Sequence, residues 1–126
     1  AKVTSGVQAV MADGQMGFYV IAEASNDETT TIAGALMVTQ EWSDWRNGLF
    51  WIQSVYIRNE YRRQGIYRLL YSHVKALAEE AGNVCGFRLY VEKENQIAQR
   101  TYEALGMAET HYAMYEEEIL PSAVIE

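Results

Sequence analysis

The sequence lacks a second cysteine. Cys85 is the only cysteine among 126 residues, so no disulfide can form within the chain, which fits a reducing compartment. The sequence also has no apolar run as long as a membrane span, and it does not open on a basic and hydrophobic leader. We therefore expect a cytoplasmic protein with no membrane partner.

Positive charge is scarce as well. The 10 Lys and Arg residues stand against 17 Asp and Glu residues, a formal net charge of −7, which disfavours nucleic acid and mildly favours a cationic partner such as an amine. His73 and His111 lie far apart with no third ligand at a recognised spacing, which argues against a metal site. The sequence contains no Ser, His and Asp set of the kind that would suggest a hydrolase. It also contains no Gly-Lys-Ser/Thr loop of the kind that would suggest nucleotide hydrolysis.

What is present fits one globular domain over residues 1–126. Hydrophobic residues make up 49% of the chain and charged residues 21%, an ordinary balance for a chain large enough to fold without disulfides or metals. We see no internal repeat, low-complexity segment or linker. The two tryptophans at Trp42 and Trp45 are expected to cap the core in preference to walling a pocket.

The hydrophobic pattern predicts strands and helices in an α/β (α+β) arrangement. In chain order we expect a short helix at Thr4–Met11, a hairpin of Phe18–Ala24 and Thr30–Gln40, a loop at Glu41–Gly48, a central strand at Leu49–Ile57, a helix at Gln64–Ala81, a strand at Phe87–Glu92, a helix at Asn95–Leu105, a last strand at Met107–Ile119 and a tail from Pro121. The strand-helix-strand unit should close right-handed, which makes its two strands parallel. Gly82 and Gly106 are expected to end the two longer helices.

The connection from the central strand into the next helix reads Arg-Arg-Gln-Gly-Ile-Tyr-Arg, from Arg62 to Arg68. A strand that turns through a glycine into a helix leaves backbone N–H groups aimed at one point, with the positive end of the helix dipole behind them. Gly65 lets the backbone approach a pyrophosphate closely, and Arg62, Arg63 and Arg68 add guanidinium groups. Turns with one glycine are common, so this turn alone is weak evidence for a phosphate site.

A second motif follows the next strand. With the turn, it resembles the GCN5-related N-acetyltransferase (GNAT) superfamily, whose signature reads Arg/Gln-x-x-Gly-x-Gly/Ala and later Asn-x-x-Ala-x-x-x-Tyr-x-x-x-Gly-Phe. The residues that fall in register are Arg62, Gly65, Asn95, Ala98, Tyr102 and Gly106. The sequence departs from the signature at Tyr67, where the family usually has a second small residue, and at Met107, where it has phenylalanine.

The resemblance implies a mixed, mostly antiparallel twisted sheet with a splayed parallel strand pair and flanking helices. It implies acetyl-CoA as co-substrate, no metal, and transfer of the acetyl group to a primary amine by direct attack in a ternary complex. The amine is a small molecule or part of a peptide, and relatives often form homodimers. A non-catalytic acyl-CoA-binding or interaction module of the same fold, and a site for another nucleotide, stay open as alternatives.

The resemblance also implies roles for particular residues. The cofactor-binding residues would be Val55, Tyr56, Ile57, Arg62, Arg63, Gln64, Gly65, Ile66, Tyr67, Arg68, Asn95 and Tyr102. Tyr102 would also be the acid that protonates the leaving thiolate, although its place on an apolar stripe equally fits the core, and Asn95 equally fits a helix N-cap. The central strand has no carboxylate to act as base, so we expect a water relay that ends at Glu92 or Glu94.

Compared with the family, the chain looks short at its front, because only Ala1–Met11 precedes the hairpin. A truncated chain, a partner chain that completes the site, and a minimal variant all stay open. The identity of the amine stays open too, since a polyamine, an aminoglycoside, a lysine side chain and a protein N-terminus fit the acidic charge about equally.

Overall fold

The computed structural model describes residues 16–25, 28–43 and 47–120. They belong to two compact units, the sheet unit within Asp13–Tyr90 and a second unit that we call the C-terminal unit, described over residues 91–120. The helix expected at Thr4–Met11, Trp45 and the tail from Pro121 lie outside the described residues. Over the described ranges, no helix is long and apolar enough to cross a membrane.

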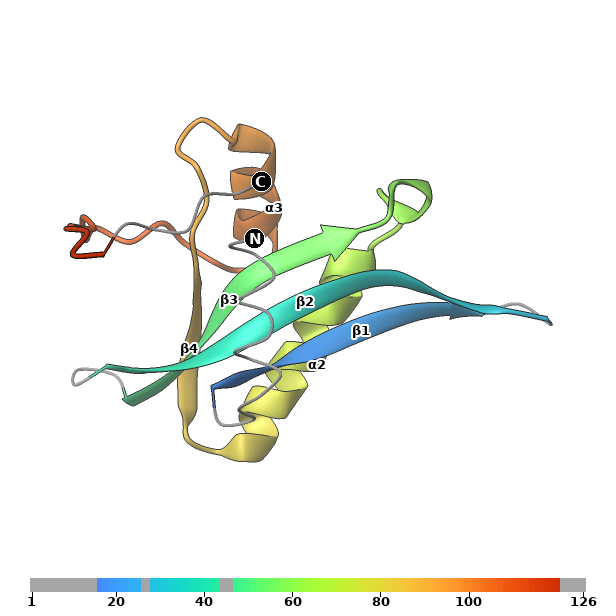
Figure 1. Cartoon of the computed structure of the whole chain (residues 1–126), viewed down its shortest axis with the longest axis horizontal. Helices are drawn as coiled ribbons and strands as arrows, with labels where there is room; N and C mark the ends of the chain where they lie inside the picture. The colour runs from blue at the N-terminus through green and yellow to red at the C-terminus, as the bar shows by residue number, and fades with distance from the viewer. Residues whose placement is uncertain (1–15, 26–27, 44–46, 121–126) are drawn as a thin grey trace. The chain divides into compact units, whose positions relative to one another are not determined.

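The sheet unit is built on a mixed sheet with the strand order β1-β2-β3-β4 (Figure 1). Its described strands are β1 (Gly17–Ser25), β2 (Thr30–Ser43), β3 (Asn47–Ile57) and β4 (Val84–Leu89). β1 and β3 pair antiparallel with β2, and β4 pairs parallel with β3. The mixed, mostly antiparallel sheet with one parallel pair is therefore confirmed.

The loop expected at Glu41–Gly48 is too long. Trp42 pairs with Gly48 and Glu41 with Leu49, so β2 and β3 continue as a ladder to Ser43 and Asn47. The side chain of Trp42 is 69% exposed, because it lies at the end of this hairpin. The expectation that Trp42 caps the core is therefore wrong.

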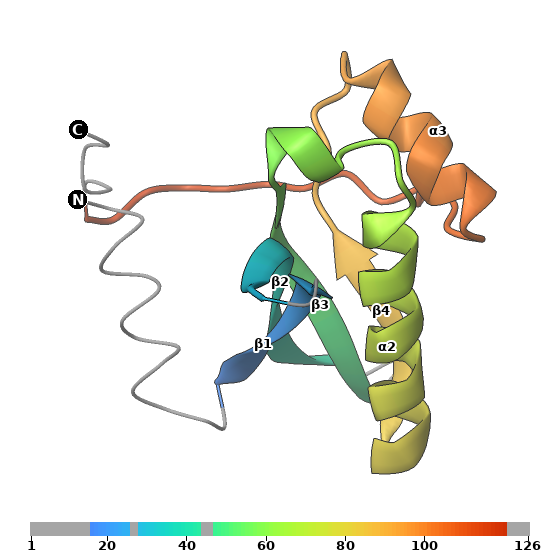
Figure 2. The ribbon, with the colours of Figure 1, turned by 90° about the vertical axis from the view of Figure 1, so that its right-hand side faces the viewer.

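Helix α2 (Ile66–Ala81) lies against one face of the sheet (Figure 2). The side chains that it buries recur every three or four residues, as an amphipathic helix requires; they are Leu70, Tyr71, Val74 and Ala78. The helix begins two residues later than expected because Gly65 has a left-handed backbone, φ 79°. It ends at Gly82, as expected, where a second left-handed glycine at φ 80° donates its N–H to the carbonyl of Ala78 at 3.2 Å.

The parallel pair separates toward the C-terminal ends of its strands. Pairing between β3 and β4 stops at Ile52 and Leu89, whereas β3 continues to Ile57. Met37 pairs with Ser54 and Val38 with Ile52, so Gln53 is an extra residue that forms a β-bulge. A bulge bends its strand and increases the local twist, and β3 turns away from β4 (Figure 1).

This bend also explains where β4 lies. The strand expected at Phe87–Glu92 begins earlier, at Val84, and ends at Leu89. Beyond Leu89, β3 has turned away, so the chain after β4 has no neighbouring strand with which to form further ladder hydrogen bonds.

Helix α3 (Gln96–Ala104) lies in the C-terminal unit and is one residue shorter at each end than the expected Asn95–Leu105, because Asn95 and Leu105 are its caps. The Oδ1 atom of Asn95 accepts a hydrogen bond from the N–H of Ala98 at 3.1 Å, an N-cap. Gly106, at φ 99°, donates to the carbonyl of Glu103, and Met107 donates to that of Tyr102, both at 3.0 Å. These two bonds form a Schellman motif, which closes the helix.

The prediction of a last strand at Met107–Ile119 is wrong. Residues 107–119 contain no strand in the structure as described. Strand-forming side chains are present, and those of Tyr112, Met114 and Tyr115 are exposed, but a strand also requires a ladder of hydrogen bonds to a neighbour. Composition alone did not reveal that this ladder is missing.

Candidate functional site

The connection between β3 and α2 is held in shape by its own hydrogen bonds. It passes through a short 3-10 helix, η1 (Asn59–Tyr61), and Arg62 donates its backbone N–H to the carbonyl of Asn59 at 3.3 Å. The Nε atom of Arg62 also donates to the carbonyl of Ile57 at 3.0 Å, and Nε2 of Gln64 donates to that of Glu60 at 3.0 Å. The bond to Ile57 ties the turn to the end of β3, and the other two tie it to η1.

The N-terminus of α2 is open for an anion. No side chain caps it, and its first turn contains no acidic residue. A Cβ atom built on Gly65 would meet nothing within 4 Å, so space lies directly in front of the turn. The N–H groups of a first helical turn precede the intrahelical bonds and carry the positive end of the dipole. An anion such as a phosphate is the group that this arrangement suits best.

Exposed arginines surround this N-terminus. Arg62 and Arg63 precede Gly65 and Arg68 follows it, and all three side chains are exposed. Arg63 has a left-handed backbone, φ 63°, a rare conformation outside glycine that marks a tight turn. The structure adds Arg58, an exposed arginine at the start of η1 that the sequence motif did not single out. In a chain of net charge −7, these groups make the turn locally positive.

The end of β3 adjoins the turn. Val55, Tyr56 and Ile57 pair with β2 on one side, but on the β4 side the ladder has already stopped at Ile52. Tyr56 is 61% exposed, and the bond from Arg62 reaches Ile57 itself. The structure thus brings together two groups of residues that the sequence motif had joined only by resemblance, Val55–Ile57 and Arg62–Arg68.

Asn95 and Tyr102 lie in the C-terminal unit and are described within it. Gln99 donates from Nε2 to the carbonyls of Glu92 and Lys93, at 3.0 and 2.8 Å, which orders the segment in front of Asn95. Tyr102 is partly buried, and burial raises the pKa of its phenol above the usual 10.0. The phenol therefore stays protonated throughout the neutral range.

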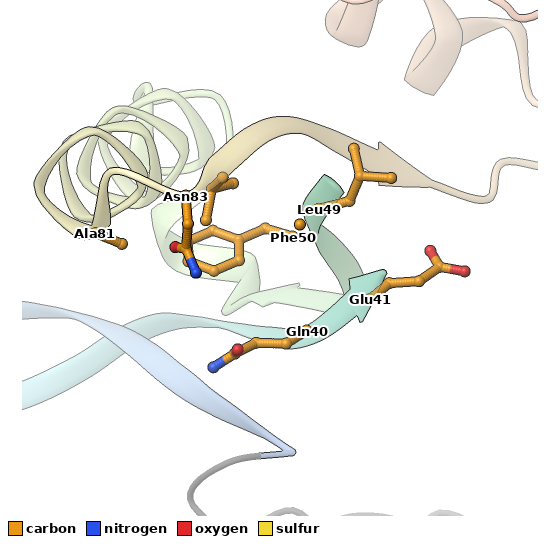
Figure 3. A pocket seen from close by; sticks show the side chains of 8 residues that line it. Gln40, Glu41, Leu49, Phe50, Ala81 and Asn83 are labelled. Carbon is orange, nitrogen blue, oxygen red and sulfur yellow. The ribbon is translucent and has the colours of Figure 1, made fainter. Parts of the chain in front are cut away.

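One hollow lies at the end of the sheet unit where α2 ends. It has about 180 Å³ of space and is lined by Gln40, Glu41, Gly48, Leu49, Phe50, Ala81, Asn83 and Val84 (Figure 3). Phe50 and Asn83 both line the hollow, whereas the side chain of Glu41 points away from both. Because it adjoins the C-terminus of α2, this hollow is separate from the arginine-rich turn.

A second hollow of about 250 Å³ is lined by Thr39, Gln40, Glu41, Trp51, Gln53 and Tyr90. Sequence reasoning missed it. Thr39 and Glu41 are two residues apart, as are Trp51 and Gln53, so each pair is expected on one face of its strand. This spacing was the only sign of the hollow in the sequence. The register that brings the two strands together, and the bulge at Gln53, were not readable from the pattern.

Comparisons with known proteins agree on one family. The model of the acetyltransferase (GNAT) family matches residues 6–107, whereas a search of curated proteins finds no match. The crystal structure of a possible acetyltransferase from Clostridium difficile 630 is 43% identical, with a TM-score of 0.78 over 94% of this chain and 76% of that one.

Two further solved structures share the fold. A probable acetyltransferase is 24% identical, with a TM-score of 0.74 over 93% of this chain and 76% of that one. An aminoglycoside N-acetyltransferase in complex with CoA is 17% identical, with a TM-score of 0.70 over 94% and 87%. The family match and the 43% identical relative carry the assignment: this chain belongs to the GNAT family of acetyl-CoA-dependent N-acetyltransferases.

Proposed function

We propose that this chain transfers the acetyl group of acetyl-CoA to a primary amine, by direct attack in a ternary complex. The observation that carries the proposal is the uncapped N-terminus of α2 beside the end of β3, which pairs with β2 but has no ladder on its β4 side. The first suits a pyrophosphate, and the second offers a strand edge to the amide groups of a pantetheine arm.

The turn fits a pyrophosphate in spite of Tyr67. The ring of Tyr67 stacks on that of Tyr71, one helical turn further along α2, with centroids 6.1 Å apart. Its bulk therefore packs along the helix. The open space in front of Gly65 is left for the phosphate oxygens, and Arg62, Arg63 and Arg68 would balance their charge.

The edge formed by Val55, Tyr56 and Ile57 would hold the pantetheine arm by backbone hydrogen bonds. One N–H group of this edge would donate to the thioester carbonyl and stabilise the charge that develops on its oxygen during attack. Acetyl-CoA supplies the activated acyl group when it is bound. The residues of this chain supply position, donors and acceptors.

Transfer forms a C–N bond and breaks the C–S bond, so one proton must reach the sulfur and one must leave the amine. Tyr102 would donate its phenol proton to the departing sulfur, and burial keeps it in the protonated form that this role needs. The proton from the amine would leave through water toward Glu92 or Glu94, both exposed. Asn95 would hydrogen-bond the pantetheine in addition to capping α3.

A calorimetric titration with acetyl-CoA, with ADP as control, tests the proposal. We expect a micromolar dissociation constant for acetyl-CoA and binding of ADP at least about 10-fold weaker, since ADP lacks the pantetheine arm. Equal affinities would indicate a site for another nucleotide, and no binding of either would overturn the proposal. If acetyl-CoA binds but no amine of a broad panel causes it to release the free thiol of CoA, the chain is an acyl-CoA-binding module.

The remaining expectations have equally direct tests. The acceptor would be a small-molecule or peptide amine, which the same panel distinguishes. A homodimer is an expectation from the family, and light scattering of the purified chain tests it.

A further inference from the structure

Gly34 lies on β2 directly opposite Ile57, the last residue of β3. A Cβ atom built on Gly34 would lie 2.7 Å from Cδ1 of Ile57 and 3.3 Å from Cγ2 of Ile66, the first residue of α2. Both side chains therefore reach over Gly34, one from the end of the strand and one from the start of the helix. The bare backbone of the glycine leaves the room in which they meet.

The need for glycine at this position is one of space. Gly34 lies in a paired strand and has no positive φ, so its backbone conformation suits any residue. The same built Cβ atom, however, would lie 2.9 Å from the carbonyl oxygen of Tyr56. The end of an isoleucine side chain can rotate away from a methyl group, but a carbonyl oxygen moves only with its strand. An added methyl group therefore has to displace the backbone of β3 at Tyr56.

Ala33, the residue before Gly34, holds the connection that leaves β3. The N–H of Arg58 donates to the carbonyl oxygen of Ala33 at 2.8 Å, one residue beyond the paired Ile57. Ala33 is buried, with 1% of its surface exposed. Ala33 and Gly34 together thus anchor the connection near both of its ends, at Arg58 and at Ile66.

The two halves of the proposed acetyl-CoA site meet over this stretch of β2. The proposed pantetheine edge, Val55–Ile57, ends opposite Gly34, and the helix whose N-terminus would hold the pyrophosphate begins with Ile66. Pantetheine and pyrophosphate belong to one covalent molecule. Both halves can therefore bind it at once only if their spacing matches that molecule.

We infer that Gly34 is a positioning residue for acetyl-CoA: it lets Ile57 and Ile66 pack together over β2 and so sets the spacing between the pantetheine edge and the pyrophosphate site. The inference rests on the proposed function, which supplies the ligand. Gly34 has no functional group to offer, so it acts only through the room that it leaves for these two side chains.

The variant Gly34→Ala tests the inference by calorimetry with two ligands. Acetyl-CoA spans both halves of the site and should bind about 10-fold more weakly to the variant, because its two parts no longer fit at once. ADP reaches only the pyrophosphate half and should keep its affinity. A loss that affects the long ligand and spares the short one indicates a change of spacing, because general damage to the site would weaken both.

Gly48→Ala is the matched control. A Cβ atom built on Gly48 would lie 2.7 Å from the carbonyl oxygen of Asn83, so this variant also forces a backbone oxygen to move. Gly48 lies near the start of β3, at the other end of the strand from Ile57. Gly48→Ala should lose stability to chemical denaturation, as Gly34→Ala does, but it should bind acetyl-CoA as tightly as the natural chain.

A measurement without ligand separates this inference from the proposed function. In an isotope-labelled chain, the backbone amide signals of residues 58–66 report the geometry of the connection. These signals should shift in Gly34→Ala and stay in place in Gly48→Ala. If Gly34→Ala does not fold, Ile66→Ala removes the same contact from the helix side and should produce the same difference between acetyl-CoA and ADP.

The outcomes distinguish the two proposals. If Gly34→Ala binds acetyl-CoA as tightly as Gly48→Ala does, or loses affinity for acetyl-CoA and ADP to the same extent, the inference is overturned while the proposed function stands. If the natural chain binds neither ligand, the proposed function fails and the amide signals decide. Shifts confined to Gly34→Ala would then support the positioning of the connection by Gly34, and unmoved signals would overturn it.

Discussion

Arg62 donates a hydrogen bond from Nε to the carbonyl oxygen of Ile57 across 3.0 Å. The bond joins the turn in front of α2 to the last residue of β3. The proposed pyrophosphate site lies on the turn and the proposed pantetheine edge lies on β3, so this contact links the two directly. A guanidinium can donate here through Nε while its terminal N–H groups point elsewhere.

Replacing Arg62 by lysine should therefore weaken acetyl-CoA binding although the charge is kept. An ammonium group can replace the bond to Ile57 or contact a phosphate, but it lacks the planar fork that does both. We expect the dissociation constant, measured by calorimetry, to rise about 10-fold with little change in stability. Arg100→Lys is the control, because Nε of Arg100 also bonds a backbone carbonyl, that of Gln96 at 3.4 Å. Equal affinity in both variants would remove Arg62 from the site.

Gly65 and Gly82 provide a matched pair at the two ends of α2. Both have left-handed backbones, at φ 79° and 80°, and neither has an atom within 4 Å of a built Cβ. Alanine at either position should cost about 1–2 kcal/mol of unfolding free energy, measured by chemical denaturation. Only Gly65→Ala should also weaken acetyl-CoA binding, by about 10-fold or more, because its methyl group enters the space in front of the helix N-terminus.

If acetyl-CoA binds equally well to the two alanine variants, Gly65 serves only the backbone of the turn. The comparison is informative because the two glycines share a left-handed backbone and open space at the built Cβ, and they differ in which end of the helix they cap.

Helix boundaries could be predicted because their causes are local. Asn95 caps α3 with its own side chain, and Gly82 and Gly106 end their helices through a backbone conformation that glycine favours. The strand-turn-helix part of the candidate site was predictable for the same reason, since Gly65 and its arginines lie within a few residues of one another.

What could not be predicted depends on pairing between distant segments. The bulge at Gln53 is defined only by its register with β2, and it is this bulge that shortens the ladder to β4. The same limitation explains the error at Met107–Ile119, where strand-forming residues have no ladder, and the failure to see the hollow at Trp51. Side chains from two strands, β2 and β3, and from Tyr90, the residue after β4, meet there only after the sheet has formed.

Asn95 combines a structural role that the structure establishes with a proposed one in cofactor binding. Asn95→Ala removes the N-cap of α3 and should cost about 1 kcal/mol of unfolding free energy. Asn95→Ser keeps an N-cap oxygen and should restore that stability. If the amide also holds the pantetheine, acetyl-CoA affinity stays reduced in the serine variant. Full recovery of affinity with serine would leave Asn95 with the capping role alone.

Tyr102 offers the most direct test of the chemistry. Tyr102→Phe keeps the ring and removes the proton, so turnover of acetyl-CoA with an accepted amine should fall by about 100-fold while the dissociation constant of acetyl-CoA barely moves. Tyr115→Phe, at a side chain that is 94% exposed in the same unit, should leave both unchanged.

The pH profile adds a second criterion. Burial raises the pKa of Tyr102 above 10.0, so the phenol keeps its proton at every lower pH, and its ionisation removes activity only as the pH rises through that raised value. The turnover number of the natural chain should therefore show no basic limb from Tyr102 below about pH 10. Unchanged turnover in Tyr102→Phe would show that another donor, or water, protonates the leaving sulfur.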